Sequence, residues 1–347
     1  MALYPLLRPL LFTLDAERAH GLALAALGRM PARVRRHDPR LAVSVAGLDF
    51  PSPVGLAAGL DKNAEAADGL LGLGFGSVEV GTVTPLPQAG NPRPRLFRLV
   101  EDEAIINRMG FNNEGQAAAC ARLARRDRGR GIVGVNVGAN KDAADRVADY
   151  AAGVRAMAPV ADYLTINISS PNTPGLRSLQ DAAALDALLA AVMAARAPGG
   201  PPIFLKIAPD LAPADIDAIA RVVIDRAVDA LVVANTTLSR PRLASRHAGE
   251  AGGLSGRPLA SLAARRLRDV RRATGGAVPL VAVGGIASGA EAYARIRAGA
   301  SLVQLYSAMV FAGPALPRRI ASELAALLAA DGHATLRSAI GIDDHRP

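Results

Sequence analysis

The sequence predicts an α/β fold, namely a (β/α)8 barrel preceded by a short helical segment. From about residue 53, short runs rich in aliphatic and β-branched residues alternate with alanine- and leucine-rich stretches of helical composition. The alternation repeats eight times, and a barrel of eight strands and eight helices typically takes ~250 residues. The chain has 347 residues, of which 50% are hydrophobic, so it can form this barrel, a large aliphatic core and an appendage.

Residues 1–40 differ from the rest and are predicted to form a helical pair. Six leucines between residues 3 and 14 have helical spacing, and Asp15 is placed to cap a second helix that runs through His20. Charged residues interrupt the segment, so no run approaches the ~20 apolar residues that cross a bilayer. A cleavable signal peptide is not expected either, since early positive charge is missing. We expect two parts, the helical segment 1–40 and a barrel domain 41–340.

The helical segment carries seven arginines against three acidic residues. An apolar and basic appendage of this kind can lie on an anionic membrane surface. An ordinary helical cap, packed on its own domain, has the same pattern. The segment's composition leaves both interpretations open.

Eight strands are predicted in the barrel domain, and each is followed by a helical stretch. Polar or glycine residues follow every strand, and the carboxyl ends of barrel strands form the rim where such folds place their chemistry. Turn chemistry accounts for some of these residues. The predicted strands are 54–57, 77–80, 132–136, 163–168, 203–207, 230–234, 280–283 and 302–305.

The stretch 167–175, with the sequence NISSPNTPG, contains the most informative polar residues and lies at the end of a predicted strand. Its amides and hydroxyls offer donors and acceptors without formal charge. They suit a polar, planar, amide-rich ring better than a phosphate or a metal. Pro171 and Pro174 stiffen the loop.

The composition argues against several classes of function. The net charge of +9 alone suggests a polyanionic partner. However, 37 of the 40 basic residues are arginine, which indicates a chain-wide preference, and 3% aromatic residues leave little for base stacking. Cys120 is the single cysteine and the five histidines are scattered. We therefore expect no disulfide framework, no metal and a reducing, cytoplasmic-side location, with Cys120 as a small buried filler.

Glycine-rich loops near the last strands predict a phosphate site. The segment 252–256 (GGLSG) is interpreted as a flexible loop, and Gly284 and Gly285 follow the seventh strand. Loops at this sector of a barrel offer free backbone N–H groups to a phosphate, although tight turns alone explain any one of these clusters. The sequence has neither a GxGxxG after the first strand nor a GxxxxGK[ST] loop, so a dinucleotide or a nucleoside triphosphate is disfavoured.

Two of the three lysines, Lys62 and Lys206, follow or end predicted strands at the rim, whereas Lys141 lies in a loop. Pairing with a carboxylate such as Asp61 or Asp210 is one explanation. The other is a flavin, because an ammonium group stabilises the anionic reduced ring.

Nine sequence blocks resemble, in order, the quinone-dependent (class 2) dihydroorotate dehydrogenases, and the resemblance runs from the N-terminal helices to about residue 330. The blocks are 56–62 (LAAGLDK), 81–85 (GTVTP), 94–98 (PRLFR), 107–113 (NRMGFNN), 167–175 (NISSPNTPG), 206–210 (KIAPD), 235–237 (NTT), 252–256 (GGLSG) and 306–307 (YS).

The resemblance implies an FMN-containing barrel that oxidises dihydroorotate to orotate and passes electrons to a membrane quinone in de novo pyrimidine synthesis. It implies a monomer held peripherally on the cytoplasmic side of the cell membrane, with no nucleic-acid partner. Ser170 matches the family's catalytic base. Serine is a poor base unaided, so a relay through Thr173 and a water near Phe111 is expected.

The resemblance also assigns the binding residues. One position departs from the family, because Ala234 stands where relatives often carry a threonine beside the flavin. FMN contacts are expected from Ala58, Gly59, Leu60, Asp61, Lys62, Thr82, Asn136, Asn167, Lys206, Ala234, Gly256, Gly285, Tyr306 and Ser307. Substrate contacts are expected from Lys62, Asn107, Arg108, Met109, Gly110, Phe111, Asn167, Asn172, Asn235 and Thr236.

Two features separate this chain from the class 1 relatives, which use a cysteine as base and lack the helical extension. This chain has Ser170 at that position and has the extension. By analogy the helical pair forms a quinone tunnel, with His20 and Arg98 near its inner end. Two alternatives stay open: a tRNA dihydrouridine synthase, whose expected cysteine and RNA-binding domain are missing here, and a nucleic-acid binder that would use the +9 charge.

Overall fold

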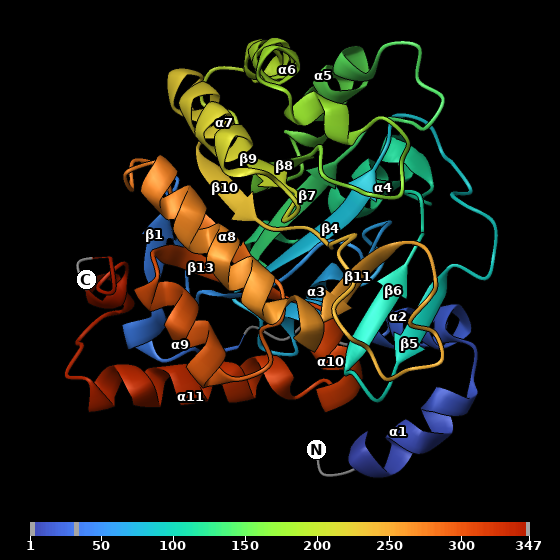
Figure 1. Ribbon diagram of the computed structural model, residues 1–347, viewed down its shortest axis with the longest axis vertical. Coiled ribbons are helices and arrows are strands. Elements are labelled where there is room, and N and C mark those ends of the chain that lie inside the picture. The colour runs from blue at the N-terminus through green and yellow to red at the C-terminus, as the bar shows by residue number, and fades with distance from the viewer. Residues whose placement is uncertain (1–3, 31–34, 345–347) are drawn as a thin grey trace.

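The eight predicted strands close into one parallel barrel (Figure 1). A computed structural model describes residues 4–30 and 35–344. Around the barrel the strands follow the order β3, β4, β7, β8, β9, β10, β12 and β13, and β13 pairs with β3. The (β/α)8 prediction is therefore confirmed. The strands are β3 (Val54–Leu56), β4 (Ser77–Val83), β7 (Ile132–Val137), β8 (Tyr163–Asn167), β9 (Ile203–Ile207), β10 (Ala230–Val233), β12 (Leu280–Val283) and β13 (Ala300–Leu305).

Helices follow the strands and cover the outside of the barrel, as Figure 1 shows for α5 to α9 and α11. Several begin at side-chain caps, such as Asp145 on α5 and Ser288 on α9. The barrel helices are α3 (Ala67–Leu71), α4 (Gly115–Leu123), α5 (Arg146–Met157), α6 (Ala182–Ala195), α7 (Pro213–Asp225), α8 (Ala260–Ala273), α9 (Gly289–Arg297), α10 (Ser307–Ala312) and α11 (Leu316–Ala330).

Two antiparallel elements were not predicted. A hairpin of β1 (Val43–Val45) and β2 (Leu48–Phe50) precedes the barrel. A three-stranded sheet consists of β5 (Leu96–Leu99), β6 (Ala104–Asn107) and β11 (Gly253–Gly256), with β6 in the middle. Its strands come from two distant parts of the chain, so local periodicity could not reveal their pairing.

The interpretation of residues 252–256 as a flexible loop is wrong, because most of them form β11. Gly253 pairs with Asn107 in the antiparallel register. A Cβ on Gly253 would come within 2.0 Å of the Thr236 hydroxyl oxygen. A Cβ on Gly256 would lie 2.4 Å from the carbonyl oxygen of Glu103 on the neighbouring backbone. Glycine is therefore needed here for close approach to a neighbouring side chain and a neighbouring backbone, and not for flexibility.

The predicted helical pair is present as α1 (Tyr4–Thr13) and α2 (Ala16–Gly28), although Leu3 lies outside the described residues. The Asp15 carboxylate caps α2 by accepting from the N–H groups of Glu17 and Arg18, as predicted. Both helices lie beside the β5–β6 sheet in Figure 1. Glu17 fastens α2 there through a carboxylate–guanidinium contact of 2.7 Å with buried Arg95. Among the described residues, no helix combines the length and hydropathy that a bilayer crossing requires.

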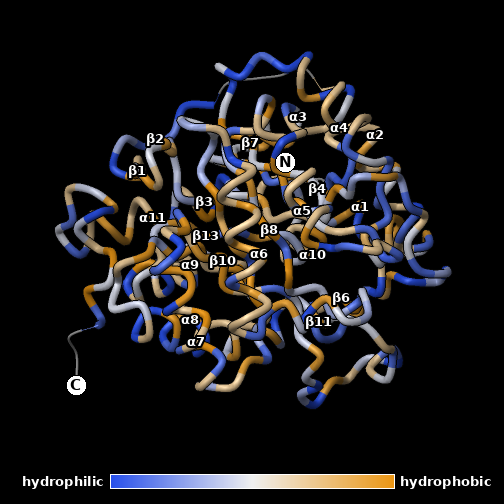
Figure 2. The backbone as a smooth tube through the Cα atoms, turned by 90° about the horizontal axis from the view of Figure 1, so that it is seen from above, coloured by the Kyte–Doolittle hydropathy of each residue, from blue (hydrophilic) through white to orange (hydrophobic). Residues whose placement is uncertain are grey.

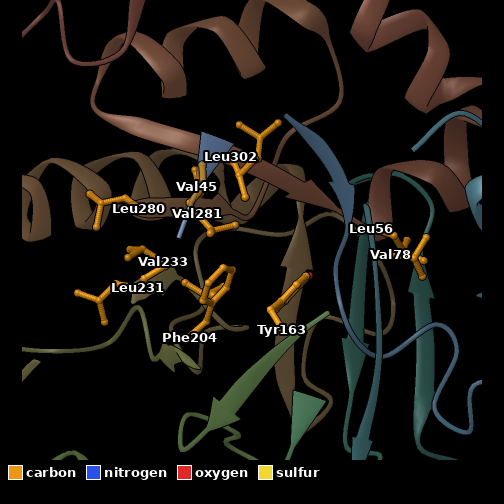
Figure 3. Close-up of a cluster of buried hydrophobic side chains, with 14 of the residues drawn as sticks. Val45, Leu56, Val78, Tyr163, Phe204, Leu231, Val233, Leu280, Val281 and Leu302 are labelled. Atoms are coloured by element: carbon orange, nitrogen blue, oxygen red, sulfur yellow. The ribbon is translucent and has the colours of Figure 1, made fainter. Parts of the chain in front are cut away.

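The core is aliphatic, as expected from the composition. Hydrophobic residues concentrate in central strands such as β10 and β13, and hydrophilic residues concentrate in the peripheral loops (Figure 2). Leu231, Leu280 and Phe204, from the neighbouring strands β10, β12 and β9, all belong to this buried cluster (Figure 3). The rings of Phe204 and Tyr163 stack with centroids 4.6 Å apart.

Space for the Tyr163 ring depends on Gly134, its register partner on β7. A Cβ on Gly134 would come within 2.1 Å of the Tyr163 ring. Since both residues are held in the barrel ladder, neither backbone can move away without loss of the strand pairing.

Gly134→Ala is expected to lower the free energy of unfolding by ~1–3 kcal/mol or more, because it overpacks the barrel interior. Gly21→Ala is the matched control, since a Cβ at Gly21 on α2 meets nothing within 4 Å. That control is expected to be neutral or slightly stabilising. Urea denaturation followed by circular dichroism measures both, and equal midpoints would contradict the packing argument.

Candidate active site

A cavity of about 420 Å³ opens at the carboxyl ends of the barrel strands, below the β5–β6–β11 sheet. The sheet contributes Leu96, Ile105 and Ser255 to its wall. Most residues that the sequence predicted for a site meet here. The predicted residues that line the cavity are Ala58, Gly59, Lys62, Thr82, Asn107, Met109, Gly110, Phe111, Asn167, Ser170, Asn172, Lys206, Ala234, Asn235, Thr236, Gly256, Gly285, Tyr306 and Ser307.

Four predicted residues lie off the cavity wall. Leu60 is part of the hydrophobic core. The buried Asp61 carboxylate accepts from the N–H groups of Glu65 and Ala66, both at 2.8 Å, and thereby holds the turn before α3. Arg108 pairs with Glu250 at 2.7 Å and covers the Phe97 ring.

Asn136, the fourth, lies behind Thr82 and Asn167. Its Oδ1 accepts from the Thr82 hydroxyl at 2.5 Å and from the Asn167 amide at 3.0 Å. It therefore orients two lining residues without forming part of the wall.

Amide side chains on the wall are held by their neighbours. The Asn167 oxygen accepts from the Ser169 hydroxyl at 3.0 Å, and the Asn235 amide donates to that same hydroxyl at 3.0 Å. The Asn172 amide donates to the Asn107 oxygen at 3.1 Å. The remaining donors and acceptors thus have defined directions, as a site for a planar amide-containing ring requires.

Ser170 lies on this wall at 5% exposure. Its hydroxyl oxygen accepts from the backbone N–H of Asn172 at 3.3 Å, which turns the side chain toward its own loop. Thr173 is also buried, three residues further along. The loop thus holds both hydroxyls in a setting with little water.

Lys206 and Lys62 bring positive charge to the cavity without a carboxylate partner among the described residues. Lys206 is 5% exposed and Lys62 is half-buried. The predicted alternative, pairing with Asp61 or Asp210, is wrong, since Asp61 holds backbone N–H groups and Asp210 pairs with Arg177 at 2.9 Å.

The environment lowers the pKa of both lysines. Burial, together with the charge of Arg95, lowers the pKa of Lys62 to about 8. Burial also lowers the pKa of Lys206, and the negative charge of Glu79 opposes this effect.

Sequence reasoning missed the polar floor beneath the cavity. Glu79 is fully buried in β4, where its carboxylate accepts from the Asn136 amide at 2.7 Å, the Gln304 amide at 2.9 Å and the Tyr163 hydroxyl at 3.2 Å. A single charged residue inside an otherwise buried strand was the available signal. Glu79 supplies fixed negative charge below Lys206.

At the end of the cavity where the sequence predicts a phosphate site, the glycine segments meet two serine hydroxyls. Gly256 and Gly285 line it with positive φ angles of 92° and 66°. The Ser255 and Ser307 hydroxyls lie 2.8 Å apart, and Ser307 begins α10. Ser255 was not predicted, although it lies inside the block 252–256.

On its N-terminal side the cavity reaches the helical extension. His20 lines it and lies 3.2 Å from the Tyr306 hydroxyl, while Phe311 and Arg8 line it further out. Burial and the charge of Lys62 lower the pKa of His20 to about 4, so His20 is neutral near pH 7. Arg98 does not line the cavity; its guanidinium donates to carbonyl oxygens at the end of α1, including those of Leu11 and Phe12.

Comparison with known proteins identifies the family. A model described as "Dihydroorotate dehydrogenase" matches residues 40–328. The protein named "Dihydroorotate dehydrogenase (quinone)" in Novosphingobium aromaticivorans is 60% identical to this chain, and the alignment covers 98% of this chain and 99% of the relative. The protein of that name in Sphingopyxis alaskensis is 62% identical, over 98% and 97% of the two chains. The chain belongs to the dihydroorotate dehydrogenase family.

A solved structure of the same family supports the fold. The crystal structure of DHODH from Eimeria tenella in complex with ferulenol superposes with a TM-score of 0.91 at 43% identity, over 96% of each chain. The resemblance derived from the sequence blocks is thus confirmed.

The lowered pKa of Lys62 predicts a specific pH dependence of stability. Below pH 8 the folded and unfolded chains both hold the proton, and the cost of burying the charge is fully present. Between pH 8 and 10.5 the unfolded chain binds more protons, so the free energy of unfolding rises with pH. Above pH 10.5 Lys62 is neutral in both the folded and the unfolded chain, so the free energy of unfolding no longer rises through this group.

Lys62→Met removes this titration. In the ligand-free protein we expect the variant to be more stable than wild type at pH 7, and the gap to narrow toward pH 10.5. Urea denaturation across this range measures it. If the difference in free energy of unfolding between variant and wild type does not change with pH, the pKa of Lys62 is not lowered in the folded chain.

Proposed function

We propose that this chain is an FMN-containing, quinone-dependent dihydroorotate dehydrogenase. It would oxidise (S)-dihydroorotate to orotate in de novo pyrimidine synthesis and pass the electrons to a membrane quinone. The observation that carries the proposal is the convergence of Ser170, Lys62 and oriented amides on one cavity wall, in a chain whose close relatives carry that name.

The cavity's residues fit FMN. Its volume of about 420 Å³ lies within the usual range of ligand sites. Lys206 is a buried cation without a carboxylate partner among the described residues, and a flavin ring that becomes anionic would supply the missing charge. The glycine loops with Ser255 and Ser307 suit the phosphate at the other end.

FMN, when bound, would accept the hydride that leaves C6 of the substrate and release the electrons to the quinone. Gly59, Thr82 and Asn167 would hold it from the barrel side, and Ala234 would contribute backbone only. Leu60, Asp61 and Asn136 would act from behind the wall, by shaping the first loop and by orienting Thr82 and Asn167.

The substrate would lie between this cofactor and the loop 167–175. Asn107, Asn172, Asn235 and Thr236 would bind its amide edges, and the Lys62 ammonium would balance its carboxylate. Met109, Gly110 and Phe111 would close the ring face. Arg108 would contribute indirectly, since it holds the 250–251 segment.

Ser170 would take the C5 proton. The N–H of Asn172, donated to its oxygen, would stabilise the developing negative charge. Burial beside Thr173 would limit water at the hydroxyl, so a relay is needed to carry the proton away.

The quinone would enter between α1 and α2, and residues 1–40 would form a membrane-contacting module. Leu6 and Leu10 on α1 are 76% and 68% exposed, and no residue of α1 is buried. An apolar helix face of this kind is costly in water and suits the surface of a bilayer. His20, Tyr306 and Phe311 would line the inner end of the passage, with Arg98 holding α1 in position.

Spectroscopy of the purified protein tests the function directly. We expect a flavin absorbance that dihydroorotate bleaches and that a soluble quinone analogue restores. Protein without flavin, or flavin that dihydroorotate leaves oxidised, would overturn the proposal.

Ser170→Ala is expected to retain FMN and to slow flavin reduction near neutral pH by about 10²–10⁴-fold, the usual contribution of a general base. Stopped-flow absorbance measures the rate. Ser261→Ala, an exposed position on α8, is the control and should leave it unchanged. Near wild-type reduction in Ser170→Ala would exclude Ser170 as the base.

Replacing Leu6 and Leu10 by Gln should release the protein from phosphatidylcholine vesicles, because it removes apolar surface that is exposed in the folded chain. Flavin reduction by dihydroorotate should continue at the wild-type rate. Co-sedimentation measures the binding, and undiminished sedimentation would argue against α1 as the membrane contact.

A further inference from the structure

A second recess, the flank groove, lies on the outside of the barrel and shares no residue with the cavity at the rim. Its volume is about 610 Å³. Three parts of the chain form it: the segment before β1, the turn between α3 and β4, and one face of α11. Its lining residues are Arg35, Arg36, His37, Asp38, Arg40, Leu41, Gly74, Arg318, Ala321, Ser322, Ala325 and Ala326.

The groove exists because small residues and a short helix leave space there. Helix α3 has five residues, so it covers less of the barrel flank than its neighbours. On α11, the apolar part of the groove wall consists of Ala321, Ala325 and Ala326. Gly74 lets Arg318 cross the turn, since a Cβ there would lie 2.4 Å from the Arg318 side chain.

Positive charge dominates the lining. Asp38 is the single carboxylate among the lining residues, and Arg40 already neutralises it through contacts of 3.0 and 2.7 Å. Burial lowers the pKa of His37, so this side chain is neutral near pH 7. Arg35 and Arg36 have no carboxylate partner in the described part of the chain.

The donors are partly fixed in place. The Nε of Arg35 donates to the carbonyl oxygen of Gly72 at 2.8 Å, which anchors the guanidinium and leaves its two terminal nitrogens for a ligand. Ser322 on α11 lines the same groove. An anchored guanidinium loses less conformational entropy when it binds an anion.

We propose that the flank groove binds a phosphate group. Guanidinium groups bind phosphate oxygens bidentately, and the four oxygens of a phosphate can serve donors that converge from separate segments, whereas a carboxylate has two. The alanine face of the groove leaves room for a small apolar group attached to the phosphate. Nothing in the proposed oxidation of dihydroorotate uses this groove.

The phosphate could belong to a soluble metabolite or to a lipid headgroup. Tyr4 of α1 packs on Gly313, shortly before α11 begins with Arg318 in its first turn. Helices α1 and α11 both lie along the lower edge of Figure 1. A bilayer that receives the α1 leucines would therefore be near the groove, and an experiment must separate the two sources.

The test compares two charge-matched variants of the FMN-loaded, full-length protein. Arg35→Ala with Arg36→Ala alters the groove. Arg265→Ala with Arg268→Ala alters the exposed face of α8 and is the control for net charge. Arg35 also holds Gly72, so its replacement could disturb the fold. Two further groove variants leave that hydrogen bond intact. They are Arg36→Ala alone and Ser322→Glu, which adds a carboxylate at an exposed position of α11.

In the first arm, inorganic phosphate is titrated by calorimetry, and the proposal predicts binding that weakens at least tenfold in the groove variants and is retained in the control. In the second arm, co-sedimentation uses phosphatidylcholine vesicles with and without 30% phosphatidylglycerol. A groove-specific loss confined to phosphate identifies a soluble source. A groove-specific loss confined to the anionic vesicles identifies a lipid source. Equal behaviour of the groove and control variants in both arms would overturn the proposal.

Discussion

Closure of the parallel barrel is the constraint on which the rest of this structure depends. Once β13 pairs with β3, the carboxyl ends of all eight strands meet at one rim. Residues as distant as Lys62 and Ser307 then line the same cavity. The closed ladder also leaves no exposed strand edge, so the loops can carry polar groups without risk to the framework.

The barrel interior balances the charges that this rim requires. Lys62 and Lys206 face the cavity without carboxylate partners in the described chain, and buried cations of this kind are costly. Glu79 lies beneath Lys206, held by Asn136, Gln304 and Tyr163. Its fixed negative charge offsets part of the cost for Lys206. The arrangement leaves positive charge available for a ligand while the folded chain stays stable.

The N-terminal pair extends the site beyond the barrel. A partly buried contact between Glu17 and Arg95 fastens α2 to the antiparallel sheet, and Arg98 holds the end of α1. His20 thereby reaches Tyr306 across the chain. The same docking leaves the α1 leucines exposed, so one helical pair provides both a wall of the cavity and an apolar outer surface.

The sequence by itself determined the eight strands, the two N-terminal helices and most of the cavity wall, because these follow from local periodicity, capping at Asp15 and the polar residues after each strand. The tertiary structure decided what depends on contacts between distant segments. It converted residues 253–256 from a predicted loop into a strand opposite β6, and it moved Asp61, Asn136 and Arg108 behind the wall. It also revealed the role of Glu79, whose three donors come from three other strands. Local patterns encode which side chains a strand or helix presents, whereas pairing partners and burial depend on the closed fold.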